Sequence, residues 1–427
     1  MLRDEFAKNK NVLEIASGTG QHAVFFGRAM PHLHWQTSEL AHNHKGIQAW
    51  LDEAQLSNVL SPVTLDVFAP TWPIDKVDAV FNANTVHIVS WEGVEKMFAG
   101  LGRVLTTGGI VCIYGAYNYG GKFTSESNER FDQWLKSRDP VSGVRDFEAV
   151  NLLAEAQGLR AGFAAASAKA SNQLANRPIY LQSVERADQM QGEVHALVDL
   201  PYAGARAVLL RAEPWCGILI LHLNMQYCRA SGAAGQETLD AGIGRKFDQP
   251  LADLYWLKFS LGVRHGGDDY LHVVLQAPTG PLGTTDYTIA VEALPFDAGR
   301  TLLHLRYSYA YGMAARWAMQ AYLATIGSDK VGFSTVGQRA DGQPIRVGGV
   351  RGVLERNTMR YFLAIESYLA AQATPAAGRV DKSLQDWFSA TERYPVQLHE
   401  VEREDYIAMK WRELRRQAVQ AVPLNAR

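Results

Sequence analysis

Residues 12–22 read Val-Leu-Glu-Ile-Ala-Ser-Gly-Thr-Gly-Gln-His, an apolar run that passes into two closely spaced glycines and then into a helical pattern. Gly18 and Gly20 allow the backbone to turn and to approach a ligand where a Cβ atom would interfere. A helix that starts directly after such a turn offers free N–H groups. The stretch therefore predicts the strand, turn and helix of a nucleotide-binding α/β domain.

The sequence on either side repeats the alternation of apolar runs with amphipathic segments up to about residue 170. We expect strands at 12–16, 34–38, 61–65, 79–82 and 110–114, and helices at 21–29, 44–54 and 93–104. Strands that alternate with helices in this way are typical of a doubly wound, mostly parallel sheet. The predicted fold class of this part is thus a Rossmann-like α/β domain.

Polar residues end several of these strands, and their charge helps to choose the ligand. Glu14, Glu39, Asp66 and Asn84 lie where carboxyl ends of parallel strands would converge on one crevice. The glycine spacing, with Glu39 about twenty residues further on, suits NAD as well as S-adenosylmethionine. The carboxylate of Glu14 would repel a pyrophosphate but suits a sulfonium or ammonium group. This favours S-adenosylmethionine over NAD.

Several motifs of residues 10–175 carry a family resemblance. They are VLEIASGTGQHAVFF at 12–26, Trp35 with Ser38-Glu39, Asn84 with His87-Ile88 and Trp91-Glu92, Ser127-Asn-Glu-Arg-Phe131, Arg138-Asp-Pro and Arg145-Asp-Phe-Glu148. The segment resembles a class I S-adenosylmethionine-dependent methyltransferase and, more narrowly, a small methyltransferase-like family.

The resemblance implies a role for each matched position. Those around the cofactor are Glu14, Ser17, Gly18 and Gly20 near the methionine portion, Glu39 on the ribose, Asp66 near the adenine, and Asn84 beside the methyl group. His87 is the candidate base for an acceptor that must lose a proton, with Glu92 as its orienting partner. A core or helix-capping histidine is the equally open alternative. The Arg and Asp residues at 138, 139, 145 and 146 suit a substrate lid or an internal salt-bridge network, and we favour the network.

The chain changes character near residue 175. We expect strands at 192–201, 270–275, 287–294 and 301–309, with the last two joined by a turn at 295–299, and helices at 202–210, 314–325 and 354–372. This order resembles the START-like helix-grip fold, in which a curved sheet wraps a C-terminal helix around an apolar cavity. The resemblance implies a hydrophobic or lipid-like ligand.

Five polar residues interrupt the apolar strands of this second region and are candidates for its ligand pocket: His222, Asn224, Arg306, Tyr309 and Tyr311. Tyr307, Tyr309 and Tyr311 recur with period two, which places them on one face of a strand. Cys216, His222 and Cys228 do not match a common zinc spacing, so we expect no metal site.

Composition limits the remaining classes. The 427 residues, 47% hydrophobic and 20% charged, suit three parts: residues 1–175, residues 176–375 and a helical tail at 376–427. A net charge of -2 without a basic patch argues against nucleic acid as a partner. Three cysteines argue against a secreted disulfide framework, and the first residues lack an export signal, so we expect a cytoplasmic location. The longest aliphatic run is too short to span a bilayer.

Three functions remain open. The first is a methyltransferase that acts on a small, hydrophobic acceptor presented by the START-like domain. The second is a lipid-binding or lipid-transfer protein with an inactive methyltransferase fold, favoured by a start close to the first strand, where the resembled family carries an Arg-Asn segment. The third is a nicotinamide-dependent dehydrogenase, which Glu14 disfavours.

Overall fold

The computed structural model describes residues 2–168, 173–174, 177–233, 235–247, 249–312 and 330–419. The helix expected at 314–325 lies outside these residues. Contacts within the chain divide it into two units, Met1–Gly162 (unit 1) and Phe163–Arg427 (unit 2). Each unit is described by itself below.

Unit 1 alternates strands and helices as the sequence predicts. Its elements are α1 (Leu2–Glu5), β1 (Asn11–Ile15), α2 (Gln21–Ala29), β2 (His34–Glu39), α3 (His44–Ala54), β3 (Val59–Thr64), β4 (Val77–Ala83), α4 (Trp91–Val104), β5 (Leu105–Tyr114), β6 (Tyr117–Tyr119), β7 (Lys122–Phe123), α5 (Glu126–Arg138), β8 (Arg145–Asp146) and α6 (Phe147–Ala168). The last helix, α6, continues past Gly162 into unit 2.

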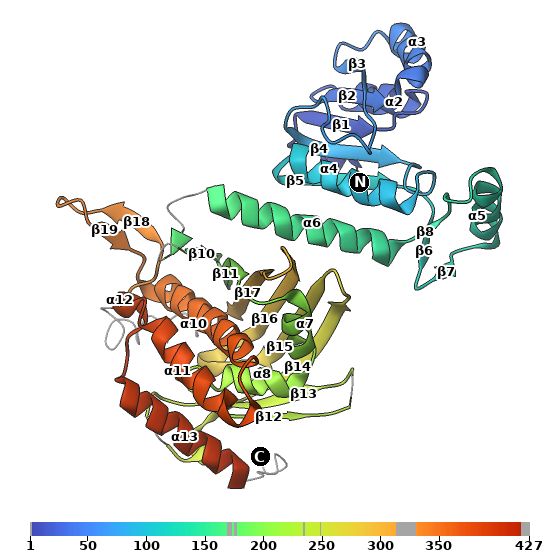
Figure 1. Cartoon of the computed structure of the whole chain (residues 1–427). Helices are drawn as coiled ribbons and strands as arrows, with labels where there is room; N and C mark the ends of the chain where they lie inside the picture. The colour runs from blue at the N-terminus through green and yellow to red at the C-terminus, as the bar shows by residue number, and fades with distance from the viewer. Residues whose placement is uncertain are drawn as a thin grey trace. The chain divides into compact units, whose positions relative to one another are not determined.

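The core of unit 1 is a five-stranded sheet in the order β3-β2-β1-β4-β5, and every pair of neighbours is parallel (Figure 1). Buried residues of α4, such as Phe98, pack with Leu13 on one face, while those of α2 and α3, such as Ile47, pack with Val12 on the other. The strand β1 alternates its side chains between these two cores. The prediction of a doubly wound parallel sheet is confirmed.

Unit 2 is built around an antiparallel sheet. Its strands are β9 (Gln173–Leu174), β10 (Arg177–Glu185), β11 (Gln189–Val198), β12 (Met225–Ser231), β13 (Thr238–Ile243), β14 (Tyr255–Gly266), β15 (Leu271–Thr279), β16 (Thr284–Pro295), β17 (Thr301–Tyr311), β18 (Thr335–Gln338) and β19 (Pro344–Arg346). Its helices are α7 (Tyr202–Leu209), α8 (Ala212–Leu219), α10 (Gly349–Ala371), α11 (Arg379–Thr391), α12 (Pro395–Leu398) and α13 (Arg403–Val419).

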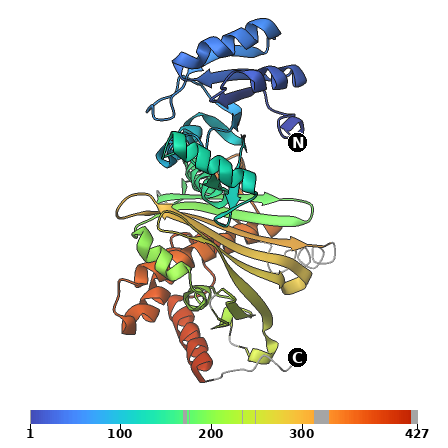
Figure 2. The same ribbon diagram turned by 90° about the vertical axis from the view of Figure 1, so that its right-hand side faces the viewer.

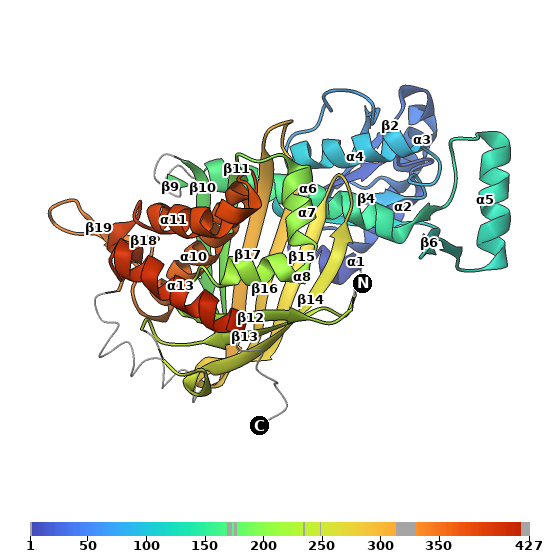
Figure 3. The same cartoon turned by 60° about the horizontal axis from the view of Figure 1, so that its bottom comes forward.

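Nine of these strands form one sheet in the order β12-β13-β14-β15-β16-β17-β11-β10-β9. The helices α10, α11 and α13 lie together on one side of it, as Figure 2 shows, and α8 lies beside α10 across β14 to β17 (Figure 3). The helix α10 is buried nearly all round, which is typical of a helix in the centre of a large core. It approaches β11 so closely that a Cβ atom at Gly192 would lie 2.2 Å from the Thr358 hydroxyl.

The alanine-rich stretch from 164 continues α6 as far as Ala168, because alanine favours helix even without an amphipathic pattern. One segment differs from the sequence predictions. The helices at 376–427, expected as a separate tail, contribute Leu384, Trp387 and Tyr406 to the core of unit 2. None of the helices in the described part of the chain combines the length and apolar character needed to cross a bilayer.

Candidate functional site

The glycine turn after β1 forms the centre of the site in unit 1. Gly18 and Gly20 have φ angles of 59° and 89°, which glycine adopts at little cost. A Cβ atom at Gly20 would meet Ile47 of α3 at 3.2 Å, whereas one at Gly18 would have no neighbour within 4 Å. Gly20 is therefore required for packing, and Gly18 borders open space beside the start of α2.

Glu14, the last polar residue of β1, is 1% exposed. Its Oε2 atom accepts a hydrogen bond of 3.0 Å from the indole of Trp35. Burial raises the pKa of Glu14 to about 7, although hydrogen bonds from Trp35 and Ser17 act in the opposite direction. Within the described residues, no positively charged side chain forms an ion pair with Glu14. The chain thus keeps a buried acid without a counter-charge at the end of β1.

Glu39, the last residue of β2, links the glycine turn after β1 to the end of β2 through hydrogen bonds. One carboxylate oxygen accepts from the Gly18 N–H at 3.1 Å and the other from the Leu40 N–H at 2.8 Å. Ser17 adds a third link, because its hydroxyl accepts from the Ser38 N–H at 3.1 Å. A carboxylate has about four acceptor positions, so Glu39 retains room for ligand hydroxyls.

The ends of β3 and β4 bring two further predicted residues to the same edge of the sheet. Asp66 is exposed, and its Oδ1 accepts from the Phe68 N–H at 2.9 Å. Asn84 has a φ angle of 57° and donates its backbone N–H to the Tyr114 carbonyl at 2.8 Å. Asparagine tolerates this left-handed conformation better than most residues. The side chain of Asn84 is exposed.

His87 follows β4 and is 3% exposed. Its ring meets Phe131 of α5 edge to face, with 5.0 Å between ring centroids. Burial lowers the pKa of His87, and the positive charge of Arg145 lowers it further, so the imidazole is neutral at neutral pH. Its Nδ1 lies 3.4 Å from the position that a Cβ atom at Gly115 would take. A neutral imidazole at this edge can accept a proton.

Glu92 does not join His87. It lies exposed in the first turn of α4, and the described residues form no hydrogen bond or ion pair between the two side chains. Ser90 caps this helix, and its hydroxyl accepts from the Gly93 N–H at 3.2 Å.

The residue that sequence reasoning undervalued is Arg145. In place of the expected salt bridge, its guanidinium donates to three backbone carbonyls, those of Val86 at 3.3 Å, Val89 at 2.7 Å and Val141 at 2.7 Å. The bonds to Val86 and Val89 flank His87 on the loop between β4 and α4. A basic residue after the fifth strand was the available signal, but its partners are backbone atoms that no side-chain pattern encodes.

The five ligand-pocket candidates of unit 2 do not share one pocket. Tyr309 and Tyr311 lie on the same face of β17 as predicted, but Arg306 lies on the opposite face, because strand side chains alternate. On that face the Nε of Arg306 lies 3.8 Å from the Oε1 of Glu193, and its Nη2 lies 3.7 Å from the Oε2 of Glu292.

His222 and Asn224 support the backbone where β12 begins. The Nδ1 of His222 accepts from the Asn224 N–H at 3.2 Å, and Asn224 donates to the Gly244 carbonyl at 2.9 Å. The His222 ring stacks on Tyr361 of α10, with 5.0 Å between centroids. Tyr361 in turn contacts Tyr307, at 5.1 Å. Aromatic side chains therefore fill this part of the space between the sheet and α10.

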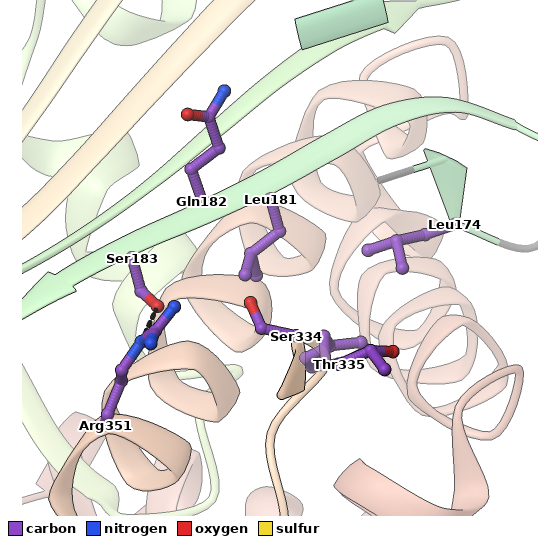
Figure 4. A pocket seen from close by; sticks show the side chains of 8 residues that line it. Leu174, Leu181, Gln182, Ser183, Ser334, Thr335 and Arg351 are labelled. Carbon is purple, nitrogen blue, oxygen red and sulfur yellow. Dashed lines mark hydrogen bonds between the residues drawn. The ribbon is translucent and has the colours of Figure 1, made fainter. Parts of the chain in front are cut away.

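Unit 2 contains cavities elsewhere. One of about 290 Å³ lies between β10, β18 and the start of α10. In it Arg351 donates to the Ser183 hydroxyl at 2.7 Å, while Gln182 points away from that pair (Figure 4). Ser183 also donates to Glu355, a fully buried carboxylate that accepts from the Phe333 and Ser334 N–H groups. The polar side chains named in this cavity therefore have hydrogen-bond partners within the protein.

A larger cavity of about 500 Å³ lies among α7, α8, α10, α11 and α13. Its lining is mixed: apolar side chains, among them Val208, Ile220 and Leu384, lie beside the charged residues Arg211, Glu213 and Arg379. It is not lined by any of the five predicted pocket residues.

Cys216 and Cys228 form a disulfide with Cα atoms 5.2 Å apart, which the cysteine count did not predict. The bond links α8 to β12. His222 lies between the two cysteines in sequence, and no group of three or more metal-ligating side chains converges within the described residues.

Comparison with known proteins adds the following findings. The model of a family described as "Protein of unknown function (DUF938)" matches residues 1–193. Among solved structures, the chain is similar to mitomycin 7-O-methyltransferase MmcR, at 13% identity over 36% of this chain and 43% of that one, with a TM-score of 0.32.

Two further solved structures are similar at the same level. An O-methyltransferase family protein from Burkholderia thailandensis is 14% identical over 42% of this chain and 49% of that one, with a TM-score of 0.33. The S-adenosylmethionine-dependent methyltransferase SibL is 18% identical over 42% and 48%, with a TM-score of 0.32. The chain spans less than half the length of each of these three proteins.

Proposed function

We propose that unit 1 is an S-adenosylmethionine-dependent methyltransferase that acts on a small-molecule acceptor. The observation that carries this proposal is Glu14, a buried acid without a cationic partner in the described residues. Keeping a carboxylate in such a place costs stability, because burial disfavours its charged form. A cationic ligand at the glycine turn would offset this cost, and S-adenosylmethionine carries two positive groups.

The residues around Glu14 fit the other parts of the same cofactor. Gly18 leaves open space, Glu39 has acceptor positions for ribose hydroxyls, and Asp66 and Asn84 are exposed at the same edge of the sheet. When bound, S-adenosylmethionine supplies an activated methyl group. The chain's part is to bind and orient, since in-line methyl transfer depends mainly on positioning. His87, neutral at neutral pH, would accept the proton from an acceptor hydroxyl or amine.

Titration calorimetry on the full chain tests this proposal. S-adenosylmethionine, S-adenosylhomocysteine and NAD are each titrated into the wild type, Glu39→Gln and, as a matched control, Glu53→Gln, an exposed carboxylate on α3. We expect micromolar binding of both adenosyl compounds, weakened at least about tenfold by Glu39→Gln and unchanged by Glu53→Gln. Binding of NAD alone would support the dehydrogenase, and no binding of any of the three would reject the proposal.

For unit 2 we propose a START-like helix-grip domain that binds a hydrophobic small molecule. The support is the element order: β11, two short helices, six strands from β12 to β17 that return to β11, and then the long helix α10. The cavity of about 500 Å³ among the helices has the size of a small-molecule site, and part of its lining is apolar. The proposed ligand position therefore moves from the sheet face, where tyrosines pack, to this cavity.

A fluorescent dansyl-labelled fatty acid is a suitable probe for that cavity. Val208→Trp fills the cavity from α7, and Val336→Trp makes the same change at an exposed position of β18. We expect probe binding to be lost in the first variant and kept in the second. If the wild type does not bind the probe, or both variants bind it equally, the cavity is not the binding site.

A further inference from the structure

An open pocket of unit 1, a cavity of about 350 Å³, is lined by residues other than those of the proposed cofactor site. Its lining comes from Trp91 at the start of α4, Asn118 of β6, Gly121, Arg145 and Asp146 of β8, and Ala149 in the first turn of α6. All of these residues belong to the described part of unit 1, and none of them has a part in holding the glycine turn.

Arg145 gives this cavity a positive charge that no acidic side chain balances by an ion pair in the described residues. Its three hydrogen bonds go to neutral carbonyls. Asp132, the acid that acts electrostatically on Arg145, is bonded instead to Lys136 at 2.7 Å and to the Val144 N–H at 2.9 Å. Half-burial lowers the pKa of Arg145, which shows that its charge is held at a cost. An anionic ligand would offset that cost.

Two helix starts contribute positive potential, which one acid in the first turn of each helix, Glu92 and Glu148, offsets in part. The helices α4 and α6, of 14 and 22 residues, each begin beside the cavity, at Trp91 and Phe147. The N-terminal end of a helix carries a partial positive charge. The three bonds of Arg145 use its Nε hydrogen and both Nη2 hydrogens, so within the described residues its Nη1 group is left to donate to an oxygen of a carboxylate or phosphate.

We propose that this cavity binds an anionic group, a carboxylate or a phosphate, of the methyl acceptor. The proposal rests on the methyltransferase function proposed above. The cavity and the candidate base share one loop, because Arg145 holds the carbonyls of Val86 and Val89 on either side of His87, and Gly143 donates its N–H to the His87 carbonyl at 2.9 Å. An anion held by Arg145 therefore sits against the segment that orients the imidazole.

Asp146 makes the proposal sharp, because its carboxylate lines the same cavity and opposes an anion there. Removing the charge of Arg145 and removing that of Asp146 must change anion binding in opposite directions. A purely structural role of either residue would not produce this reversal of sign.

The experiment uses the full chain and four small probes that share one ring: benzoate, phenyl phosphate, benzyl alcohol and benzylamine. Binding is followed by calorimetry in the presence of saturating S-adenosylhomocysteine. We expect benzoate or phenyl phosphate to bind and the two other probes not to bind. We expect Arg145→Gln to weaken the anion at least about tenfold and Asp146→Asn to strengthen it roughly threefold.

Controls separate the possible failures. Arg138→Gln removes a neighbouring cation, one that stacks on Trp134 and lies outside the cavity lining, and should leave anion binding unchanged. If Arg145→Gln unfolds unit 1, which thermal melting would reveal, Asp146→Asn still decides. Anion binding that neither variant changes, or no anion binding to a wild type that binds S-adenosylhomocysteine, overturns the proposal. A wild type that does not bind S-adenosylhomocysteine would instead reject the methyltransferase function.

Discussion

The carboxyl edge of the parallel sheet in unit 1 and the interior of unit 2 differ in whether their charged side chains form ion pairs. In unit 1, Glu14 and Arg145 are held by hydrogen bonds to neutral groups and form no ion pair within the described residues. In unit 2, Lys410 is fully buried but bonded to Glu413 at 2.9 Å, and His304 is bonded to Glu292 at 2.8 Å. Buried charges that are paired hold a fold together, whereas charges without partners indicate sites kept for ligands.

Glu400 has the largest number of cationic partners among the paired charges of unit 2 named here. Its carboxylate, 8% exposed, receives Lys246, Lys330, Arg356 and Arg360 from three separate parts of unit 2. These cations hold the pKa of Glu400 far below its usual value, against the effect of burial.

The largest expected effect is on this cluster. Glu400→Gln leaves four cations facing one another, so we expect unit 2 to lose about 3–5 kcal/mol in its free energy of unfolding. Chemical denaturation followed by far-ultraviolet circular dichroism measures this. The neighbouring Glu402→Gln, at an exposed position, should change stability by less than about 0.5 kcal/mol. Similar small changes in both variants would contradict the structural role of the cluster.

Glu14→Gln should produce the reverse outcome. The pKa of Glu14 is about 7 in the folded chain against an ordinary value of 4.5, so unit 1 loses stability as the pH rises from about 4.5 to 7. Above that range the full cost, about 3 kcal/mol, is present. The variant should therefore stabilise unit 1 at pH 8 by about that amount while weakening S-adenosylmethionine binding.

Two measurements check this prediction. Thermal melting from pH 4.5 to 8 should show a falling stability of unit 1 in the wild type and little change in Glu14→Gln. Calorimetry should show that wild-type affinity for S-adenosylmethionine rises from pH 6 to 8, because the cation binds the ionised form. A variant that is less stable than the wild type at pH 8 would argue that Glu14 is structural.

Reduction of the disulfide should have a somewhat smaller effect. Cys216 and Cys228 are 12 residues apart, and closing a loop of that size contributes about 2–3 kcal/mol. We expect a reductant to lower the denaturation midpoint of unit 2 and leave that of unit 1 unchanged. Cys112→Ser, which alters the free cysteine of unit 1, serves as the control. Equal midpoints with and without reductant would show that the bond does not contribute.

The last expected effect appears only in acid. Glu193 and Glu292 have pKa values of about 2. That of Glu193 is lowered mainly by His304, whose Nε2 lies 3.8 Å from the Glu193 Oε2. That of Glu292 is lowered because the bonds from His304 and Tyr270 outweigh its burial. Their contribution to stability is present above about pH 4.5 and is lost as the pH falls toward 2. The free energy of unfolding of unit 2 should therefore fall on acidification below about pH 4.5, where protonated Glu14 no longer costs unit 1 stability. Glu292→Gln should reduce this acid loss, and an unchanged acid limb would refute the assignment.

Local pattern predicted most of unit 1. The helices 21–29 and 44–54 have the bounds that the sequence suggested, because a glycine turn and apolar periodicity mark them locally. In unit 2, β15 to β17 and the helix α10 were likewise predicted as antiparallel neighbours and a long late helix. The helical residues 164–168 were not predicted, since alanine without periodicity gives no pattern but still favours helix.

The candidate sites divide along the same line. The sequence by itself determined which residues end the parallel strands, so Glu14, Glu39, Asp66 and Asn84 could be placed at one edge, because the edge follows from strand order alone. The opposite faces of Arg306 and Tyr309 also follow from the period of two along a strand. Only the tertiary structure decided that Glu92 lies apart from His87 and that Arg145 binds carbonyls instead of carboxylates. The carbonyls of Val86 and Val89 lie 59 and 56 residues before Arg145 in the chain, and such meetings are fixed by packing in three dimensions.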